Sequence, residues 1–588
     1  MSRLWILIFL LSLPVFAQEE LEVIEVETVK DIDRFTFGDA NEIPERDIET
    51  ASTALIAPAI EKTPGIVTTQ NGGPGGTVSF FIRGTEGRHV GFTLDGLKLN
   101  DSSNTGRLFD AAFMTSPFLR DVTVHKGPQA VLFGSDAMGG VVELKSRKGE
   151  NAPETRVLIN GGSFGTIDGT VSSDWKKKDH NGTVTLTRFH TDGISRLNEK
   201  RFNATEADSA DITQATSSSE HKWAKKWQTD FLFSYLHGKN ELDGATTDTK
   251  NDHSINDQYL VQQKTSYELN DQSVLLLRNG LNRNQRFIRM ESTGPLPFEG
   301  NLYQNELVHR LELPQWGFLT GVSNEHETSS TTSVDKSFDL NSFFLQSAFK
   351  SNDFKLQAGG RADHHSQYGE FVTGSGGVAY KDFSVQYSQG FKAPSLYQLY
   401  APVFGNKDLV PERNHSWEVS WRKSVDEWSG GITFFQNRLS NLINYSFVDN
   451  AYFNQGKFIA EGVELSAGWK SDRFEVVPTF THQKFRENEE PVLRRPYNMA
   501  QLSFSYFPVE TIELNATGRW FSSRKDIDEN FQTVKLNGYS VLDIGAKKTW
   551  IRDEVGVQVK NVLDREYEEL YGYSVLPFSV FVHYGHKF

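Results

Sequence analysis

Three carboxylates in one short segment have a spacing at which they could bind one metal ion. Glu206, Asp208 and Asp211 lie within residues 203–211, two and three positions apart. Carboxylate oxygens at such spacing can act as hard ligands of a single cation. The alternative interpretation is a solvated acidic loop, and the residues alone favour that loop over a metal site.

The sequence contains no familiar catalytic motif. The chain has no cysteine, which excludes a disulfide framework, a zinc knuckle and a thiol nucleophile. It contains no His-Glu-x-x-His or Gly-x-Ser-x-Gly sequence, and Ser135 falls in a predicted turn. It also has no phosphate-binding loop, so energy for any active process must come from elsewhere. We therefore expect a protein that is not an enzyme and has no covalent cofactor.

The composition excludes several further classes of protein. The 588 residues include 61 Lys and Arg against 76 Asp and Glu, a net charge of -15 that disfavours a nucleic-acid partner. Only the N-terminus approaches the roughly 20 apolar residues that a transmembrane helix needs. Yet 43 Phe, 18 Tyr and 11 Trp accompany 48 Gly in a chain with a mean hydropathy of -0.47. This mixture suits a large β-structure that has one face in an apolar medium.

Residues 1–17 are typical of a secretory signal peptide. One basic residue precedes an apolar run from Leu4 to Leu13, and small residues stand at the positions that signal peptidase requires before a cut after Ala17. A membrane anchor is the alternative, but the apolar run is too short to span a bilayer. We expect the mature chain to cross the inner membrane of a bacterium.

Residues 18–44 are acidic and contain one alternating stretch. Apolar and acidic side chains alternate in this stretch, which is the pattern of a β-strand; it consists of Leu21, Glu22, Val23, Ile24, Glu25, Val26 and Glu27. No neighbouring strand in the sequence could pair with it, so it could add to the sheet of another protein. The alternative is a disordered acidic tail.

Residues 45–149 and 150–588 follow different patterns. The first range predicts a compact α/β domain, with a helix over 48–60 and strands over 78–82, 91–94, 122–124 and 141–144, joined by glycine-rich turns. The second range consists of segments of about ten residues in which apolar and polar side chains alternate, as transmembrane β-barrels require. At about 20 residues for each strand with its connection, it predicts roughly 22 strands. A soluble β-sandwich or propeller is the alternative.

Several motifs resemble the TonB-dependent outer-membrane receptors in order and spacing. They are Thr63-Pro64-Gly65-Ile66, Phe81-Ile82-Arg83-Gly84-Thr85, Leu94-Asp95-Gly96 and the run from Lys126 to Val142. The resemblance implies an all-β membrane protein, a 22-stranded antiparallel transmembrane β-barrel with the N-terminal α/β plug domain inside its lumen. It implies a multi-pass protein of the bacterial outer membrane that actively takes up a scarce, large ligand.

The same resemblance implies the partners. Residues 21–27 would be the TonB box, which binds TonB by strand addition and so couples uptake to the energising complex of the inner membrane. Outer-membrane lipid and the barrel-assembly machinery would be the other partners. Arg83 would have a structural role, and we expect it to pair with an acidic residue of the barrel wall or of the plug, for example Asp95 or Asp136.

Within the family, a further set of motifs is most similar to the receptors of cobalamin (vitamin B12). The set comprises Gln70-Asn71-Gly72-Gly73, Phe391-Lys392-Ala393-Pro394-Ser395-Leu396, Leu493-Arg494-Arg495 and Asn561 to Tyr567. This likeness implies a corrinoid ligand, and calcium bound by Glu206, Asp208 and Asp211. The ligand contacts that it implies are Thr77, Ser79, Glu86, Asn104, Thr105 and Arg494. Glu86 departs from the pattern, because an amide is expected there.

Other ligands and functions stay open. Ferric-siderophore uptake is excluded by no residue. Haem uptake is disfavoured because no histidine lies between Ser395 and Leu409, where haem receptors typically have one. The chain lacks the catalytic motifs expected of an outer-membrane barrel enzyme, and its N-terminal plug argues against a passive porin.

Overall fold

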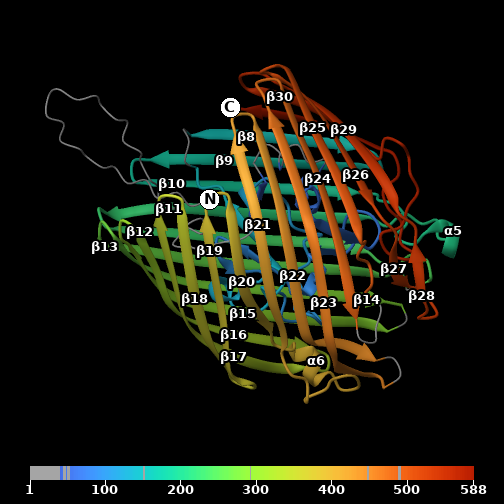
Figure 1. The fold of residues 1–588 in the computed structure, drawn as a ribbon. Coiled ribbons are helices and arrows are strands. Elements are labelled where there is room, and N and C mark those ends of the chain that lie inside the picture. Colours follow the sequence, from blue (N-terminus) through green and yellow to red (C-terminus); the bar gives the residue numbers. More distant parts are fainter. Residues whose placement is uncertain are drawn as a thin grey trace.

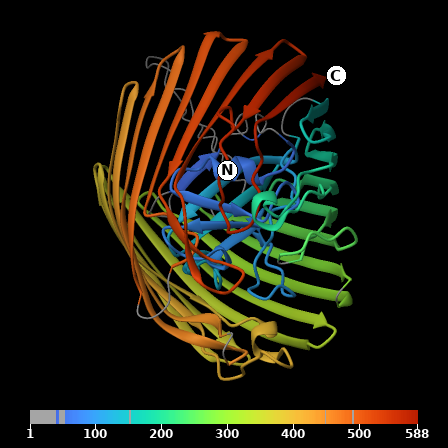
Figure 2. The same cartoon turned by 90° about the vertical axis from the view of Figure 1, so that its right-hand side faces the viewer.

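A closed β-sheet surrounds a smaller N-terminal domain in the computed structural model of this protein (Figures 1 and 2). The structure describes residues 40–43, 48, 53–149, 153–244, 246–291, 293–446, 449–487 and 492–588. The predicted signal peptide, residues 1–17, and the predicted TonB box, residues 21–27, lie outside these described residues.

The closed sheet is a barrel of 22 antiparallel strands, as the sequence predicts. Each strand pairs with its neighbours along the chain, and β31 pairs with β8 to close the barrel. The strands are β8 (Glu154–Gly162), β9 (Thr166–Lys177), β10 (His180–Thr191), β11 (Ala210–Ala224), β12 (Trp227–Glu241), β13 (His253–Asn270), β14 (Ser273–Met290), β15 (Gly294–Glu312), β16 (Trp316–Thr331), β17 (Asp335–Ser351), β18 (Phe354–His365), β19 (Gly369–Tyr380), β20 (Phe383–Lys392), β21 (Glu412–Val425), β22 (Trp428–Ser446), β23 (Ala451–Lys470), β24 (Phe474–Glu487), β25 (Asn498–Val509), β26 (Ile512–Phe521), β29 (Tyr539–Thr549), β30 (Asp553–Lys560) and β31 (Ser579–Lys587).

The alternating sequence pattern gives the wall two different faces. On β10, Val184 and Leu186 are 50% and 52% exposed, whereas Thr183, Thr185 and Thr187 are buried on the inner face. Successive side chains of a strand point to opposite faces, so one face of this wall can meet lipid while the other packs against the interior. No helix among the described residues is long and apolar enough to cross a membrane.

The two ends of the barrel differ in their connections. At one end the strands are joined by short turns, such as residues 178–179 and 225–226. At the other end lie long connections, among them residues 393–411, 522–538 and 561–578. Transmembrane barrels have short periplasmic turns and longer extracellular loops. We therefore call the first end the periplasmic rim and the second the extracellular mouth.

Short elements also occur in the connections at the mouth. These are α5 (Glu199–Phe202), α6 (Leu396–Tyr400), β27 (Arg524–Ile527) and β28 (Thr533–Leu536).

The N-terminal domain lies inside the barrel as a plug (blue in Figure 2). Its sheet has the strand order β1-β6-β7-β4-β5, in which β4 and β7 are parallel, and β2 and β3 form a separate antiparallel pair. Its elements are β1 (Ala40–Ile43), α3 (Ala57–Glu61), β2 (Ile66–Gln70), β3 (Val78–Ile82), η1 (Gly87–His89), β4 (Val90–Leu94), β5 (Leu97–Lys98), β6 (Leu119–Lys126), α4 (Ala130–Phe133) and β7 (Gly140–Ser146). The four predicted strands are confirmed.

The helix predicted over residues 48–60 is not continuous, because residues 53–56 are not helical and α3 spans Ala57–Glu61; residues 49–52 lie outside the described residues. Pro58 stands in the first turn of α3, where proline is tolerated, and a longer helix would place it in the interior. The preceding residues contact another part of the plug instead, since Leu55 forms a β-bridge with Thr115.

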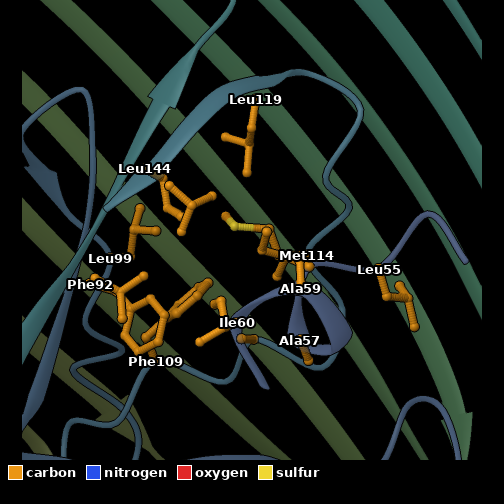
Figure 3. Packing of buried hydrophobic residues seen from close by; sticks show 14 of the residues in the cluster. Leu55, Ala57, Ala59, Ile60, Phe92, Leu99, Phe109, Met114, Leu119 and Leu144 are labelled. Carbon is orange, nitrogen blue, oxygen red and sulfur yellow. The ribbon is translucent and has the colours of Figure 1, made fainter. Parts of the chain in front are cut away.

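Apolar side chains from α3 and the plug strands form a continuous core (Figure 3). Ile60, Phe92, Leu99, Leu119 and Leu144 are each at most 1% exposed. The core continues onto the inner face of the wall through the buried residues of β10–β13. The plug is therefore packed against the barrel and fixes the residues at its extracellular surface.

Candidate functional site

Arg83 joins the plug to the wall. It follows β3 in a left-handed conformation (φ 48°), and its guanidinium lies 2.6 Å from Glu418 on β21 and 2.7 Å from Glu464 on β23. The expected pairing with an acidic residue of the wall is confirmed, whereas the two examples, Asp95 and Asp136, are wrong. Which wall residues would be the partners could not be read from the sequence, because they lie more than 330 residues further along the chain.

The two aspartates have other contacts. Asp95 accepts hydrogen bonds from the backbone N–H and the hydroxyl of Ser146, and so closes a turn within the plug. Asp136 lies 2.6 Å from Lys392 and 3.2 Å from Arg107. Burial opposes its ionisation, but Arg107 and Lys392 outweigh it and hold the pKa of Asp136 below its usual range.

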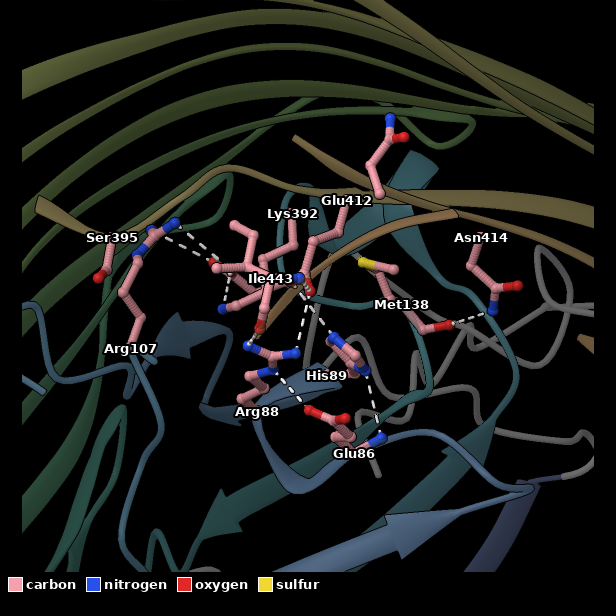
Figure 4. Close-up of polar contacts among 12 residues, drawn as sticks. Glu86, Arg88, His89, Arg107, Met138, Lys392, Ser395, Glu412, Asn414 and Ile443 are labelled. Carbon is pink, nitrogen blue, oxygen red and sulfur yellow. Dashed lines mark hydrogen bonds and ion pairs between the residues drawn. The ribbon is translucent and has the colours of Figure 1, made fainter. Parts of the chain in front are cut away.

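A second set of ion pairs lies where the plug meets the extracellular loops (Figure 4). Arg88 of η1 lies 2.7 Å from Glu86 and 3.1 Å from Glu412 of the wall. Arg495 lies 3.6 Å from the other oxygen of Glu86, and His89 lies 3.3 Å from Glu412. Burial opposes the ionisation of Glu86, but Arg88 and Arg495 together lower its pKa. The carboxylate at this position is thus compensated by two guanidinium groups.

Five plug positions predicted to contact a ligand retain accessible surface in a domain that is mostly buried. Thr77 and Thr105 are exposed, whereas the half-buried positions are Ser79, Glu86 and Asn104. The Thr105 carbonyl accepts a hydrogen bond from the hydroxyl of Ser395, 2.6 Å away, so this plug loop touches the loop that carries α6. Contact of these five residues with a ligand stays a prediction.

Arg494, the predicted contact on the barrel side, is exposed at the mouth. Its side chain lies 3.1 Å from Asp526, and its backbone N–H donates to the carbonyl of Lys525. Asp526 also accepts from the backbone N–H of Tyr571. Arg494 therefore stands where three extracellular loops meet, and its role in ligand binding stays a prediction.

A group of tyrosines lies near Arg88, and sequence reasoning did not identify it. Arg88 donates to the carbonyl of Ile443, which packs with Leu399 and Leu409. Tyr445 and Tyr452 lie 5.3 Å apart between ring centres. We call these tyrosines the tyrosine cluster; its members are Tyr368, Tyr397, Tyr400, Tyr445 and Tyr452. They come from the turn at residues 366–368, from α6, and from the adjoining ends of β22 and β23, and this dispersal hides the cluster in the sequence.

The three carboxylates of the predicted calcium set are not arranged around one point. Asp211 pairs with Arg188 and with His190 on the neighbouring strand. Asp208 accepts from the backbone N–H of Arg196. Among the described residues, no three His, Cys, Asp or Glu side chains have the arrangement of a metal site.

Glu206 and Asp208 lie near two carboxylates outside the predicted calcium set, those of Asp248 and Asp243. Buried oxygens of Glu206, Asp243 and Asp248 have no hydrogen-bond partner. Burial, and then the neighbouring Asp243, raises the pKa of Asp208 to about 7. The acidic loop thus brings its carboxylates close to those of the loop of residues 242–252, with Arg196 and Lys250 as nearby cations.

Sequence models of two families match the chain. The model "TonB dependent receptor-like, beta-barrel" matches residues 160–562, and the model "TonB-dependent Receptor Plug Domain" matches residues 34–141.

Solved structures of other proteins share the fold. The siderophore receptor PirA from Acinetobacter baumannii is 15% identical with a TM-score of 0.81, over 95% of this chain and 100% of that chain. A mutant of the ferric enterobactin receptor PfeA from Pseudomonas aeruginosa is 15% identical with a TM-score of 0.78, over 93% and 98%. The FrpB iron transporter from Neisseria meningitidis is 12% identical with a TM-score of 0.79, over 93% and 100%.

Proposed function

The chain belongs to the TonB-dependent receptor family, and on that premise we propose that it imports a ferric siderophore, with energy supplied through TonB. Members of this family are integral β-barrel proteins of the bacterial outer membrane that transport a ligand. The proposal adds the ligand class, and it assigns the TonB box to residues 21–27.

One observation carries the choice of ligand: Arg88 lies beside the tyrosine cluster, since its guanidinium donates to the carbonyl of Ile443, which packs with Tyr452. Aromatic side chains offer flat apolar contacts, and a guanidinium donates charge-assisted hydrogen bonds to oxyanions. A ferric siderophore combines oxygen-rich chelating groups with an organic frame, so it suits both surfaces. The fold shared with siderophore and iron receptors is consistent with this choice, although at 12–15% identity it carries no ligand specificity.

Cobalamin is the second candidate, and the pairing of Glu86 supports keeping it. An uncompensated carboxylate at the plug surface would cost several kcal/mol when covered by a neutral corrinoid, on the order of 2–7 kcal/mol for a buried polar group. Arg88 and Arg495 remove that objection, because they neutralise Glu86. The likeness of residues 391–396 and 493–495 to cobalamin receptors stays a prediction.

Calcium at the acidic loop is a separate proposal. The support for it is the set of unpartnered oxygens of Glu206, Asp243 and Asp248, since a hard cation would satisfy them. Titration of the purified receptor with Tb³⁺, competed with Ca²⁺, tests this proposal. Binding that survives Glu206→Gln, Asp243→Asn and Asp248→Asn together would contradict it.

Equilibrium binding to the purified, detergent-solubilised receptor separates the two ligand classes. We expect a catecholate or hydroxamate ferric siderophore to bind with a dissociation constant below about 1 μM, and cyanocobalamin not to bind in that range. Tight binding of cyanocobalamin alone would reverse the assignment. In both cases the family and its transport function would stand.

A further inference from the structure

Two neighbouring turns at the periplasmic rim concentrate positive charge in an acidic protein. The turn at residues 178–179 joins β9 to β10, and the turn at 225–226 joins β11 to β12, four strands that lie side by side in Figure 1. Residues 175–180 and 221–227 contain six lysines and one aspartate, although the whole chain has a net charge of -15. The charge of this part of the rim is therefore opposite to that of the protein.

The two turns lie against each other. His180 at the start of β10 is directly paired with His221 on β11, and the two Nδ1 atoms are 3.1 Å apart. The backbone N–H of Lys222 donates to the carbonyl of Asp179. Lysines that are more than 40 residues apart in sequence thus form one surface.

Exposed tryptophans border these lysines on the outer face of the barrel. Trp175, Trp223 and Trp227 are 38%, 62% and 47% exposed. His221 stacks on Trp223 with 5.3 Å between ring centres, and Trp175 lies 6.0 Å from His221. We call this surface the lysine–tryptophan patch; its members are Trp175, Lys177, Lys178, His180, His221, Lys222, Trp223, Lys225, Lys226 and Trp227.

The other short turns of the periplasmic rim contain fewer lysines. Each carries an acidic residue within the turn or directly beside it, as in Asp271, Asp353, Asp382, Glu427 and Glu510. Carboxylates occur in the patch as well, since Lys178 lies 3.6 Å from Asp179 and Lys222 lies 3.6 Å from Glu220, but none of the other short turns has three lysines within three residues of it. The concentration of lysine is therefore a property of one side of the barrel and not of the whole rim.

We propose that the lysine–tryptophan patch binds the headgroup of an anionic phospholipid in the periplasmic leaflet of the outer membrane. Tryptophan side chains prefer the boundary between headgroups and acyl chains, and lysines beside them attract lipid phosphates. The tryptophans lie on the lipid-facing side of the wall, which favours a lipid over a soluble polyanion.

Quenching of tryptophan fluorescence by brominated lipids tests the proposal. The full-length receptor is placed in nanodiscs with brominated phosphatidylglycerol or, at the same mole fraction, brominated phosphatidylcholine. The test variant carries Lys177→Gln, Lys178→Gln, Lys225→Gln and Lys226→Gln. The matched control carries Lys350→Gln, Lys355→Gln, Lys381→Gln and Lys423→Gln, exposed lysines at other turns of the same rim.

We expect phosphatidylglycerol to quench the wild-type protein and the control more than phosphatidylcholine does, and this preference to vanish in the test variant. Replacing the same four lysines with arginine should retain the preference for phosphatidylglycerol. That result would show that substitution at these positions leaves the fold intact. Equal quenching by both lipids in the wild type, or equal losses in test variant and control, would overturn the proposal. Displacement of the lipid by soluble polyphosphate, but not by glycerol phosphate, would also overturn it in favour of a soluble polyanion.

Discussion

The guanidinium of Arg83 in the plug donates to the carboxylate of Glu418 in the barrel wall across 2.6 Å. The side chains of Arg83 and Glu418 are 1% and 7% exposed. Glu464 of β23 contacts the same guanidinium, two strands away from Glu418 on β21. The pair therefore links the two domains at a place that water does not reach. It lies beside the short segment of the plug that leads to Glu86 and Arg88.

Removing this link should loosen the plug. Arg83→Ala removes the guanidinium that two buried carboxylates share and leaves them the longer contacts, Glu464 with Lys126 at 3.4 Å and Glu418 with Arg422 at 3.7 Å. Breaking a buried pair costs about 3–5 kcal/mol. We expect faster hydrogen exchange over residues 78–90 and a raised single-channel conductance in planar bilayers. Arg486→Ala is the control, because its pair with Glu461 is exposed and contributes about 0–1 kcal/mol. Equal effects of the two substitutions would contradict the anchoring role.

Arg88 should determine affinity for an anionic ligand. We expect Arg88→Ala to weaken the binding of a ferric siderophore roughly ten- to hundredfold, since a hydrogen bond to a charged group contributes about 1.5–3 kcal/mol. Arg88→Lys should retain part of the affinity because it keeps the charge. Isothermal titration measures both, with Arg438→Ala on the outer wall as the control. An unchanged dissociation constant for Arg88→Ala would remove this residue from the site.

The predicted TonB box should affect uptake without affecting binding. Val23→Pro or Val26→Pro would prevent strand addition, because proline lacks the backbone N–H that pairs with a partner strand. We expect unchanged ligand binding by the purified receptor and loss of energised uptake by cells. Asp33→Pro, outside the box, is the control. Uptake that persists in Val23→Pro together with Val26→Pro would place the TonB contact elsewhere.

The acidic loop should make local stability depend on pH. Burial and Asp243 raise the pKa of Asp208 from 3.8 to about 7 in the folded protein, so the folded state favours the protonated acid. The resulting stabilisation is complete below about pH 4 and is lost as the pH rises toward 7. We expect hydrogen exchange over residues 203–209 to reveal increased opening at pH 8 relative to pH 5, beyond the intrinsic effect of pH. Asp208→Asn should remove this difference.

Much of the fold follows from the sequence because it depends on local patterns. Alternation within each strand predicts the barrel, and the four plug strands were located within a few residues. The helix predicted over residues 48–60 is interrupted at residues 53–56, because the contact of Leu55 with Thr115 and the position of Pro58 outweigh helical periodicity there.

The site is less visible in the sequence because it depends on contacts between distant segments. Glu418 and Glu464 become the partners of Arg83 only when the barrel closes around the plug. Likewise, Tyr445 and Tyr452 join Tyr368 and Tyr400 through the packing of separate loops. The accessible plug positions could be predicted because motifs locate the plug, but their neighbours on the wall could not.

Uptake by living cells tests the central claim most directly. A strain without its own iron-chelate and cobalamin receptors would express this chain and be given ⁵⁵Fe-labelled siderophores or ⁵⁷Co-labelled cyanocobalamin. We expect accumulation of iron from at least one siderophore class, and its loss in the Val23→Pro variant or after collapse of the proton gradient. Accumulation of cobalamin but not iron, or iron uptake that persists without the gradient, would contradict the account.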